Sequence, residues 1–143
     1  MSDARDLVGS ELGPTSWLDV TQERIDAFAA ATSDSQWIHV DAVQAAEGPF
    51  GTTIAHGFLT LSLCVPMLHE LLPPGGAFAV NYGTNRVRFP APVPSGSRIR
   101  ARFRFVSTQQ TALGERAVIE ATVECDAAEK PVCVAELVVL TVS

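Results

Sequence analysis

The sequence contains little cysteine and no long hydrophobic run, and both shortages exclude whole classes of protein. Its 143 residues include three cysteines, Cys64, Cys125 and Cys133. Their number is odd and no Cys-x-x-Cys spacing occurs, so the sequence predicts neither a disulfide framework nor a zinc site. All three lie in apolar patterns, which is typical of buried free thiols. No apolar run approaches the roughly 20 residues of a membrane-spanning helix. The N-terminus has no signal-peptide character, and we expect a cytoplasmic protein.

Positive charge is also scarce, and most of it is confined to one stretch. The chain has 10 Lys and Arg against 16 Asp and Glu, for a net charge of −6. Six of the basic residues fall between Arg86 and Arg104, where no acidic residue occurs. This balance argues against general nucleic-acid binding. A local basic stripe remains suited to a phosphorylated small molecule.

The first part of the chain predicts short helices and turns. Residues 1–16 are polar and interrupted by Gly and Pro, so we expect a loosely attached arm before one domain at 17–143. Thr21 is a good N-cap for a helix that runs to about Thr32. A short helical piece is expected over 41–47, followed by a loop over 48–53. The length of the chain fits a single hydrophobic core.

The most apolar stretch of the chain, about 58–72, predicts a long helix buried on most sides. Pro66 lies inside it and is expected to kink or divide it, and the Pro-Pro-Gly-Gly run at 73–76 ends it. Strands are predicted at 78–89, 98–105, 118–125 and 132–142, with a Pro-rich turn over 90–96. The last strand is almost continuously apolar, as a central strand would be. These elements predict an α+β fold in which a curved antiparallel sheet wraps around one apolar helix.

One polar cluster stands out. Asp34 and His39 lie five residues apart, close enough for a carboxylate and an imidazole to share one water molecule. His56 and Gly57 open the apolar helix and offer backbone N–H groups at its N-terminus. Together they supply a base, an acid and an anion hole, which is what proton chemistry beside a carbonyl requires. On the residues alone, a turn cap at Asp34 and a structural core histidine at His39 are the favoured explanation of the pattern.

The motifs resemble those of a known family. The run from Phe28 to Asp34, with His39 and Ala45 behind it, resembles the hydratase signature of R-specific enoyl-CoA hydratases. The similarity extends through Gly51–Phe58 and through Val87-x-Phe89-x-x-Pro92-Val93-x-x-Gly96. From about Trp17 onward the chain is thus similar to the MaoC-like dehydratases. This resemblance implies a hotdog fold, a homodimer, and catalysis without a metal or redox cofactor, with coenzyme A present only as part of the substrate.

The chain departs from the family at one place. Family members commonly carry Gly-Asp-x-Asn-Pro-[aliphatic]-His, whereas this chain reads Ser33-Asp34-Ser35-Gln36-Trp37-Ile38-His39. The Asp and His keep their spacing, but Gln36 and Trp37 replace Asn-Pro. We expect both residues to lie at the substrate, where the bulky indole would reshape the acyl pocket.

The resemblance also assigns roles to individual residues. It implies that Asp34 and His39 activate water and handle the proton at C2, while the Gly57 N–H holds the thioester oxygen. Ser62 is expected to support catalysis by a hydrogen bond to Asp34, although a helix-interior serine often bonds its own backbone instead. His56 is expected to organise the loop or to line the pocket.

The basic stretch offers candidates for binding coenzyme A. Alternation over Arg98–Arg104 indicates a solvated sheet face, balanced by Glu120 and Glu124 on a neighbouring strand. Arg86 and Arg88, beside the Pro-rich turn, are the better phosphate ligands. We expect Asn81, Tyr82 and Asn85 to line the same groove.

The sequence therefore predicts an R-specific enoyl-CoA hydratase, a hydro-lyase that interconverts trans-2-enoyl-CoA and (3R)-3-hydroxyacyl-CoA. Two related enzymes remain open, a hotdog acyl-CoA thioesterase and a dehydratase acting on acyl-carrier-protein substrates. A non-catalytic acyl-CoA-binding module is a third alternative. The intact pair of Asp34 and His39 argues against that module, which needs no proton-transfer groups.

Overall fold

The computed structural model describes residues 4–73 and 78–142. A 3-10 helix, η1 (Ala4–Leu7), precedes the α-helices α1 (Gln22–Thr32), α2 (Trp37–Val40), α3 (Ala42–Ala46) and α4 (Gly57–Leu71). The strands are β1 (Glu11–Leu12), β2 (Leu18–Val20), β3 (Phe78–Arg88), β4 (Ser97–Thr111), β5 (Gly114–Cys125) and β6 (Cys133–Val142). None of the helices in this part of the chain is long and apolar enough to span a membrane. The expected helix terminator at 74–76 lies outside the described residues.

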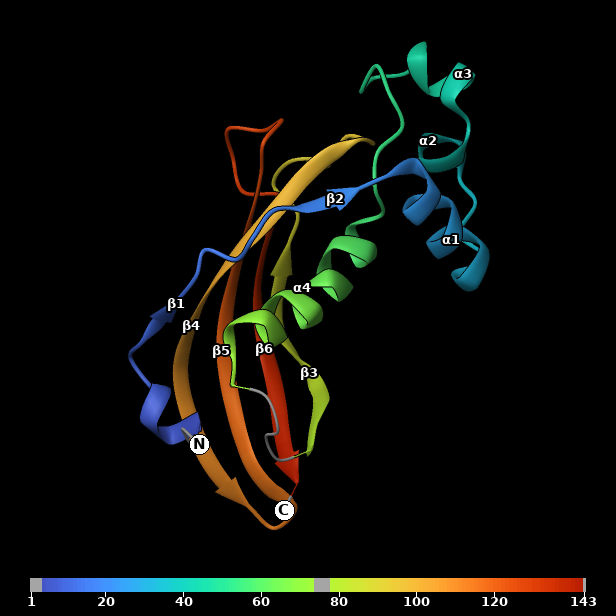
Figure 1. Ribbon diagram of the computed structural model, residues 1–143. Helices are drawn as coiled ribbons and strands as arrows, with labels where there is room; N and C mark the ends of the chain where they lie inside the picture. The colour runs from blue at the N-terminus through green and yellow to red at the C-terminus, as the bar shows by residue number, and fades with distance from the viewer. Residues whose placement is uncertain (1–3, 74–77, 143) are drawn as a thin grey trace.

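The strands form one antiparallel sheet in the order β1-β4-β5-β6-β3, with β2 also pairing β4. Figure 1 shows the sheet curving around α4, while α1, α2 and α3 extend beyond one end. The predicted α+β fold with a curved sheet around one long helix is therefore confirmed. The apolar strand β6 lies between β5 and β3, as its sequence predicts. β3 ends the strand order, so its outer edge has no partner among the described strands.

Alternation along β4 separates the core from the outer face. Ile99, Ala101 and Phe103 are at most 1% exposed and face the core that α4 covers. The arginines of β4 alternate with these residues and lie on the outer face, where Arg102 is opposite Thr122 and two others are opposite acidic residues of β5. Arg100 pairs with Glu124 and Arg104 with Glu120. The outer face is thus internally charge-balanced, as the sequence predicts.

Helix α4 differs from expectation in two respects. It continues through Pro66 without being divided. Pro66 has no N–H to donate to the carbonyl of Ser62, but Ser62 lies on the exposed side of the helix, where water can reach that carbonyl. That side is not covered. Phe58, Ser62 and Pro66 recur every four residues and remain exposed, so only one face of α4 packs on the sheet.

The cysteines match the prediction, since all three are buried and free. Cys64 on α4 and Cys133 on β6 share a hydrogen bond across the core. That bond, together with burial, raises the pKa of the Cys64 thiol well above its ordinary value. The Cys64 thiol is therefore structural and protonated at neutral pH.

The expectation of a loosely attached N-terminal arm is wrong. β1 pairs with β4, with Glu11 opposite Arg104, and Gly9 N–H donates to the Phe105 carbonyl oxygen over 2.8 Å. The reason is that β4 would otherwise present an unpaired edge, whose donors and acceptors this polar segment satisfies. Sequence patterns also missed α2, which is a single turn, and the polar extension of β4 to Thr111.

Candidate active site

Asp34 follows a tight exit from α1. Thr21 caps the start of that helix by accepting a hydrogen bond from the Arg24 N–H over 3.1 Å. At the other end Ser33 adopts a left-handed conformation with φ of 62°, which turns the chain sharply. The Asp34 side chain is left exposed just beyond this turn. A position that needs positive φ explains why a glycine is common here in the family described above.

His39 lies on α2 and is buried, with 7% of its surface exposed. Its Nδ1 lies 2.7 Å from the carbonyl oxygen of Ile54. Because a carbonyl can only accept, Nδ1 carries a hydrogen, and in the neutral ring the lone pair is then on Nε2. His39 therefore presents a proton acceptor on the side away from Ile54.

His56 is the N-cap residue of α4 and is buried, at 3% exposed. Its Nε2 donates to the backbone carbonyl of Asp34 over 2.9 Å. Its ring stacks on that of His39, with centroids 3.8 Å apart and planes inclined by 22°, while Phe28 packs beside it at 4.8 Å. His56 thus holds both the backbone of Asp34 and the ring of His39.

The three side chains form one polar cluster. A carboxylate oxygen of Asp34 and one ring nitrogen each of His39 and His56 lie within 4.8 Å of one another. Two acceptors at that separation can hold a single water molecule between them. The same atoms make a poor metal site, because the lone pairs of two stacked, nearly parallel rings do not converge at the roughly 2.1 Å of a zinc–nitrogen bond.

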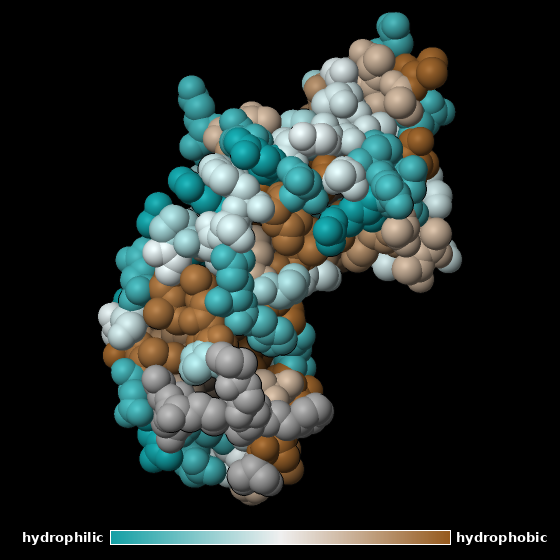
Figure 2. All heavy atoms as spheres, in the orientation of Figure 1, coloured by the Kyte–Doolittle hydropathy of each residue, from teal (hydrophilic) through white to brown (hydrophobic). Residues whose placement is uncertain are grey.

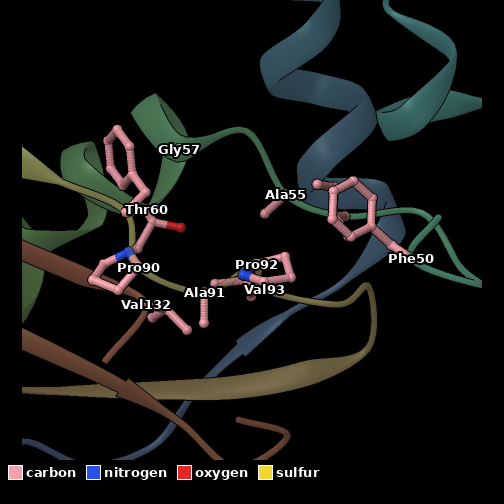
Figure 3. Close-up of a pocket in the computed structure, with 11 residues that line it drawn as sticks. Phe50, Ala55, Gly57, Thr60, Pro90, Ala91, Pro92, Val93 and Val132 are labelled. Atoms are coloured by element: carbon pink, nitrogen blue, oxygen red, sulfur yellow. The ribbon is translucent and has the colours of Figure 1, made fainter. Parts of the chain in front are cut away.

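Gly57 marks the place where this cluster meets a pocket. The pocket has a volume of about 360 Å³ and is lined mainly by apolar residues (Figure 3), namely Phe50, Ile54, Ala55, Gly57, Thr60, Phe89, Pro90, Ala91, Pro92, Val93 and Val132. No described residue accepts a hydrogen bond from the Gly57 N–H, which is free as expected at the first position of a helix. A Cβ on Gly57 would lie 2.8 Å from the Phe89 ring, so packing by itself also favours glycine here. Neither Asp34 nor His39 lines this pocket.

The far wall of the pocket is the Pro-rich turn between β3 and β4. It is fixed to the segment before α4, since Ala55 N–H donates to the Val93 carbonyl over 2.8 Å and Ser95 N–H to the Thr53 carbonyl over 2.9 Å. The sequence analysis included this turn in the family motif but assigned none of its residues to the site. Its partner is some 40 residues away along the chain, and no local pattern signals such a pairing.

Gln22 is a residue that the sequence analysis missed. Its Nε2 donates to the carbonyl oxygen of His39 over 2.8 Å, and its Oε1 accepts from the Thr53 hydroxyl over 2.6 Å. It therefore ties α1 to the backbone of the candidate catalytic histidine and to the segment before α4. A glutamine in the first turn of a helix looks like an ordinary surface residue, so no sequence signal marks this role.

Three predicted residues lie away from the pocket lining. The Ser62 hydroxyl donates to the carbonyl oxygen of Phe58 over 2.7 Å, the local bond of an exposed helix serine, and not to Asp34. Trp37 packs its ring on the backbone of Gly48, where a Cβ would come within 2.9 Å of it. Gln36 is the exposed N-cap residue of α2.

The residues proposed for coenzyme A binding are gathered on β3 and are all exposed. Tyr82 packs under the Arg116 guanidinium, and Asn85 donates to Glu136 over 2.7 Å. Arg86 lies opposite Glu136 in the sheet register, whereas Arg88 immediately precedes the pocket residue Phe89. Asn81 lies further along the strand. Of the two arginines, Arg88 is therefore the one beside the pocket.

Comparison with known proteins identifies the family. The model for the MaoC-like domain matches residues 3–128. The chain belongs to this family.

Relatives extend this result. The chain is 48% identical over 141 residues to 3-hydroxyacyl-thioester dehydratase Z of Mycobacterium tuberculosis, covering 97% of this chain and 93% of that protein. Its fold matches an unliganded R-hydratase from Pseudomonas aeruginosa with a TM-score of 0.75 at 25% identity, covering 95% and 82% of the two chains. It also matches the R-hydratase of A. caviae with a TM-score of 0.77 at 24% identity, covering 94% and 96%. The fold is the hotdog fold, and the protein is an enzyme of the hydratase and dehydratase class, a hydro-lyase.

Proposed function

We propose that this enzyme is an R-specific enoyl-CoA hydratase, which adds water reversibly to trans-2-enoyl-CoA to give (3R)-3-hydroxyacyl-CoA. The observation that carries the proposal is the placement of the Asp34 carboxylate and a ring nitrogen of His39 within 4.8 Å of each other. This spacing suits one shared water molecule. The names of the relatives support a reaction of this type.

The proposed reaction uses one water on one face of the alkene. The water oxygen bonds to C3 while its proton passes to the Asp34 and His39 pair. The electron pair of the C2=C3 bond moves toward the thioester oxygen, where the Gly57 N–H stabilises the developing negative charge. Asp34 and His39 then return a proton to C2, so that H and OH add to the same face.

The apolar pocket beside Gly57 suits the acyl chain of such a substrate. Apart from the Thr60 hydroxyl, its side chains are hydrocarbon, which favours an alkyl chain over the polar pantetheine arm. Coenzyme A would then extend outward past Arg88. A carrier-protein thioester shares the same reactive group, and assays with each thioester separate the two donors.

The proposal includes a homodimer, a cytoplasmic location and no metal or redox cofactor. Support for self-association comes from the free edge of β3 and from apolar side chains left exposed near it and on α4. Val80 is 40%, Tyr82 56% and Phe58 68% exposed. Figure 2 shows hydrophobic atoms also gathered in the hollow of one face, bordered by hydrophilic atoms. Burying such surface in a second copy is favourable.

The test is the loss of conjugated-thioester absorbance when the protein meets crotonyl-CoA and longer 2-enoyl-CoAs, with EDTA present in parallel samples. A dehydrogenase specific for the 3R product reads the stereochemistry. Asp34→Asn and His39→Gln should fold normally and lose activity by roughly 10²–10⁴-fold, the usual contribution of one proton-transfer group.

Several results would reject this proposal. Turnover retained in both variants would rule out proton transfer by Asp34 and His39, and a 3S product would rule out R specificity. A loss of activity in EDTA removes metal-free catalysis. Release of free thiol from saturated acyl-CoA indicates the thioesterase, and activity only with carrier-protein thioesters indicates the alternative donor.

A further inference from the structure

Thr60 is a largely buried residue whose hydroxyl opens onto the apolar pocket. It is 2% exposed and lies on α4, one turn after Gly57. Figure 3 shows its hydroxyl oxygen directed into the pocket, among side chains that are otherwise hydrocarbon. No described residue makes a hydrogen bond with this hydroxyl. The oxygen is not among the fully buried side-chain atoms that lack a partner, so it is open to the pocket and available to a group that enters it.

Other hydroxyls on helices of this chain behave differently. Ser62 donates to the carbonyl four residues before it over 2.7 Å, and Thr32 does the same over 2.8 Å. For Thr60 the corresponding carbonyl is that of His56, which already accepts from the Leu59 and Thr60 N–H groups over 3.1 and 3.2 Å. The hydroxyl of Thr60 therefore makes no hydrogen bond to its own helix and remains available in the pocket.

Helix geometry brings this hydroxyl toward the Gly57 N–H. Three residues advance about 4.5 Å along a helix and return almost to the same face. A helical side chain also leans toward the N-terminus and covers the preceding turn. Both Gly57 and Thr60 line the same pocket. An oxygen atom placed beside the start of α4 thus faces two unpaired donors, one from the backbone and one from a side chain.

We propose that Thr60 is a second hydrogen-bond donor to the thioester oxygen, acting with the Gly57 N–H. This inference rests on the proposed function. As water bonds to C3, the alkene electron pair moves to the thioester oxygen, and the Thr60 hydroxyl donates to the enolate that forms. The enolate charge returns to C2 when that carbon takes a proton, so the hydroxyl gives up no proton in the cycle.

The first experiment compares Thr60→Val with Thr60→Ser in hydration of crotonyl-CoA. Valine keeps the shape and removes the donor, so kcat should fall by roughly 10²-fold with KM little changed, as for other lost oxyanion donors. Serine restores the hydroxyl and should recover most of the rate. Thr122→Val, an exposed change on the outer face of β5, serves as the control and should match the wild type.

Thermal unfolding separates this role from a structural one. Since the hydroxyl has no partner in the free protein, Thr60→Val should leave the melting temperature unchanged or raise it while lowering kcat. A fall in melting temperature together with an unchanged kcat per folded molecule would overturn the proposal. A rise in KM without a loss of kcat would assign the hydroxyl to binding of the acyl chain and would overturn it as well.

The second experiment does not depend on hydration. Acetoacetyl-CoA forms an enolate with near-ultraviolet absorbance, and its formation on the protein can be titrated with pH. The midpoint should be higher with Thr60→Val than with the wild type, by one pH unit for each roughly tenfold loss of enolate stabilisation. If the midpoint is higher for Thr60→Val than for the wild type but the wild type hydrates no enoyl-CoA, the proposed function fails and the Thr60 donor stands. If hydration proceeds and neither kcat nor the midpoint changes, the Thr60 donor fails alone.

Discussion

His39 and His56 stack with their ring centroids 3.8 Å apart, and each ring forms a hydrogen bond with a backbone carbonyl near the other histidine in the sequence. His39, from the turn that begins at Asp34, bonds the carbonyl of Ile54 in the segment leading to α4. His56, at the start of α4, bonds the carbonyl of Asp34. Two hydrogen bonds, one from each histidine, therefore connect the segment around Asp34 with the segment before α4. Movement of either segment would disturb both the carboxylate and the imidazole.

This pair of hydrogen bonds predicts that His56→Phe impairs catalysis without removing a reacting group. Phenylalanine preserves a stacked ring but loses the Nε2–H bond to Asp34, so the Asp34 turn should lose its fixed position. A misplacement of about 1 Å can cost roughly 10²-fold in rate, and we expect a loss of that order in kcat. Steady-state kinetics with crotonyl-CoA measure it.

The matched control is His69→Phe, which changes an exposed histidine near the end of the same helix. This variant should keep the wild-type kcat and KM. Equal rates for His56→Phe and the wild type would show that the bond to Asp34 does not position the site.

Gln22→Met should weaken the same region from the side of α1. The methionine keeps the length of the side chain but removes its bonds to the His39 carbonyl and to the Thr53 hydroxyl. Since Thr53 is 3% exposed, its hydroxyl would be left buried and unpaired. We expect a loss of about 1–3 kcal/mol in the free energy of unfolding together with a lower kcat.

Urea denaturation followed by steady-state kinetics measures both effects. Gln44→Met, at an exposed position on α3, makes the same chemical change away from the site and should alter neither quantity. An unchanged unfolding free energy for Gln22→Met would mean that water replaces both of its hydrogen bonds.

The difference between Asp34 and Gln22 shows what the sequence can and cannot predict. The spacing of Asp34, His39 and Gly57 matches a family motif, and the alternation along β4 matches the period of a strand. Both signals are local. The contacts of Gln22 with residues 39 and 53 arise only after folding, and so does the pairing of the Pro-rich turn with residues 53–55.

Ser62 and Thr60 illustrate the same limit within a single helix. Both are hydroxyl residues in one apolar stretch, and sequence reasoning selected Ser62 for support of Asp34. The structure instead places Ser62 on the exposed side and Thr60 inside the pocket. Which of two such residues faces a pocket depends on what covers each side of the helix. That information lies in the sheet and the Pro-rich turn rather than in the helix sequence.

Ser33→Gly should stabilise the protein. Ser33 is the one non-glycine residue with positive φ in the described part of the chain, at 62°. The left-handed conformation costs an ordinary residue about 1 kcal/mol that glycine avoids, although glycine also gains freedom in the unfolded chain. We expect a net rise of about 3 °C or less in the melting temperature. Differential scanning calorimetry measures it, with Ser35→Gly as a control that should show no rise. A lower melting temperature for Ser33→Gly would mean that the serine makes a compensating interaction.

Arg88→Ala should weaken recognition of coenzyme A without touching the chemistry. Arg88 is exposed and directly precedes Phe89 at the pocket, whereas Arg86 faces Glu136 across the sheet. An exposed charge pair contributes up to about 1 kcal/mol, so KM for crotonyl-CoA should rise by up to about 5-fold with kcat unchanged. The N-acetylcysteamine thioester of crotonate carries the same alkene but no phosphate. Its kcat/KM should therefore be equal for Arg88→Ala and the wild type.

Arg102→Ala is the matched control, since Arg102 lies exposed on the outer face of β4. It should leave KM for both substrates unchanged, which separates a local contact from a general loss of positive charge. Raising the salt concentration should reduce the difference between Arg88→Ala and the wild type, because exposed ion pairs are screened within about 10 Å at 0.1 M salt. If KM rises equally for the two thioesters, Arg88 acts on the pocket through Phe89 and the phosphates of coenzyme A bind elsewhere. If it rises for neither, the phosphates make no contact with this end of β3.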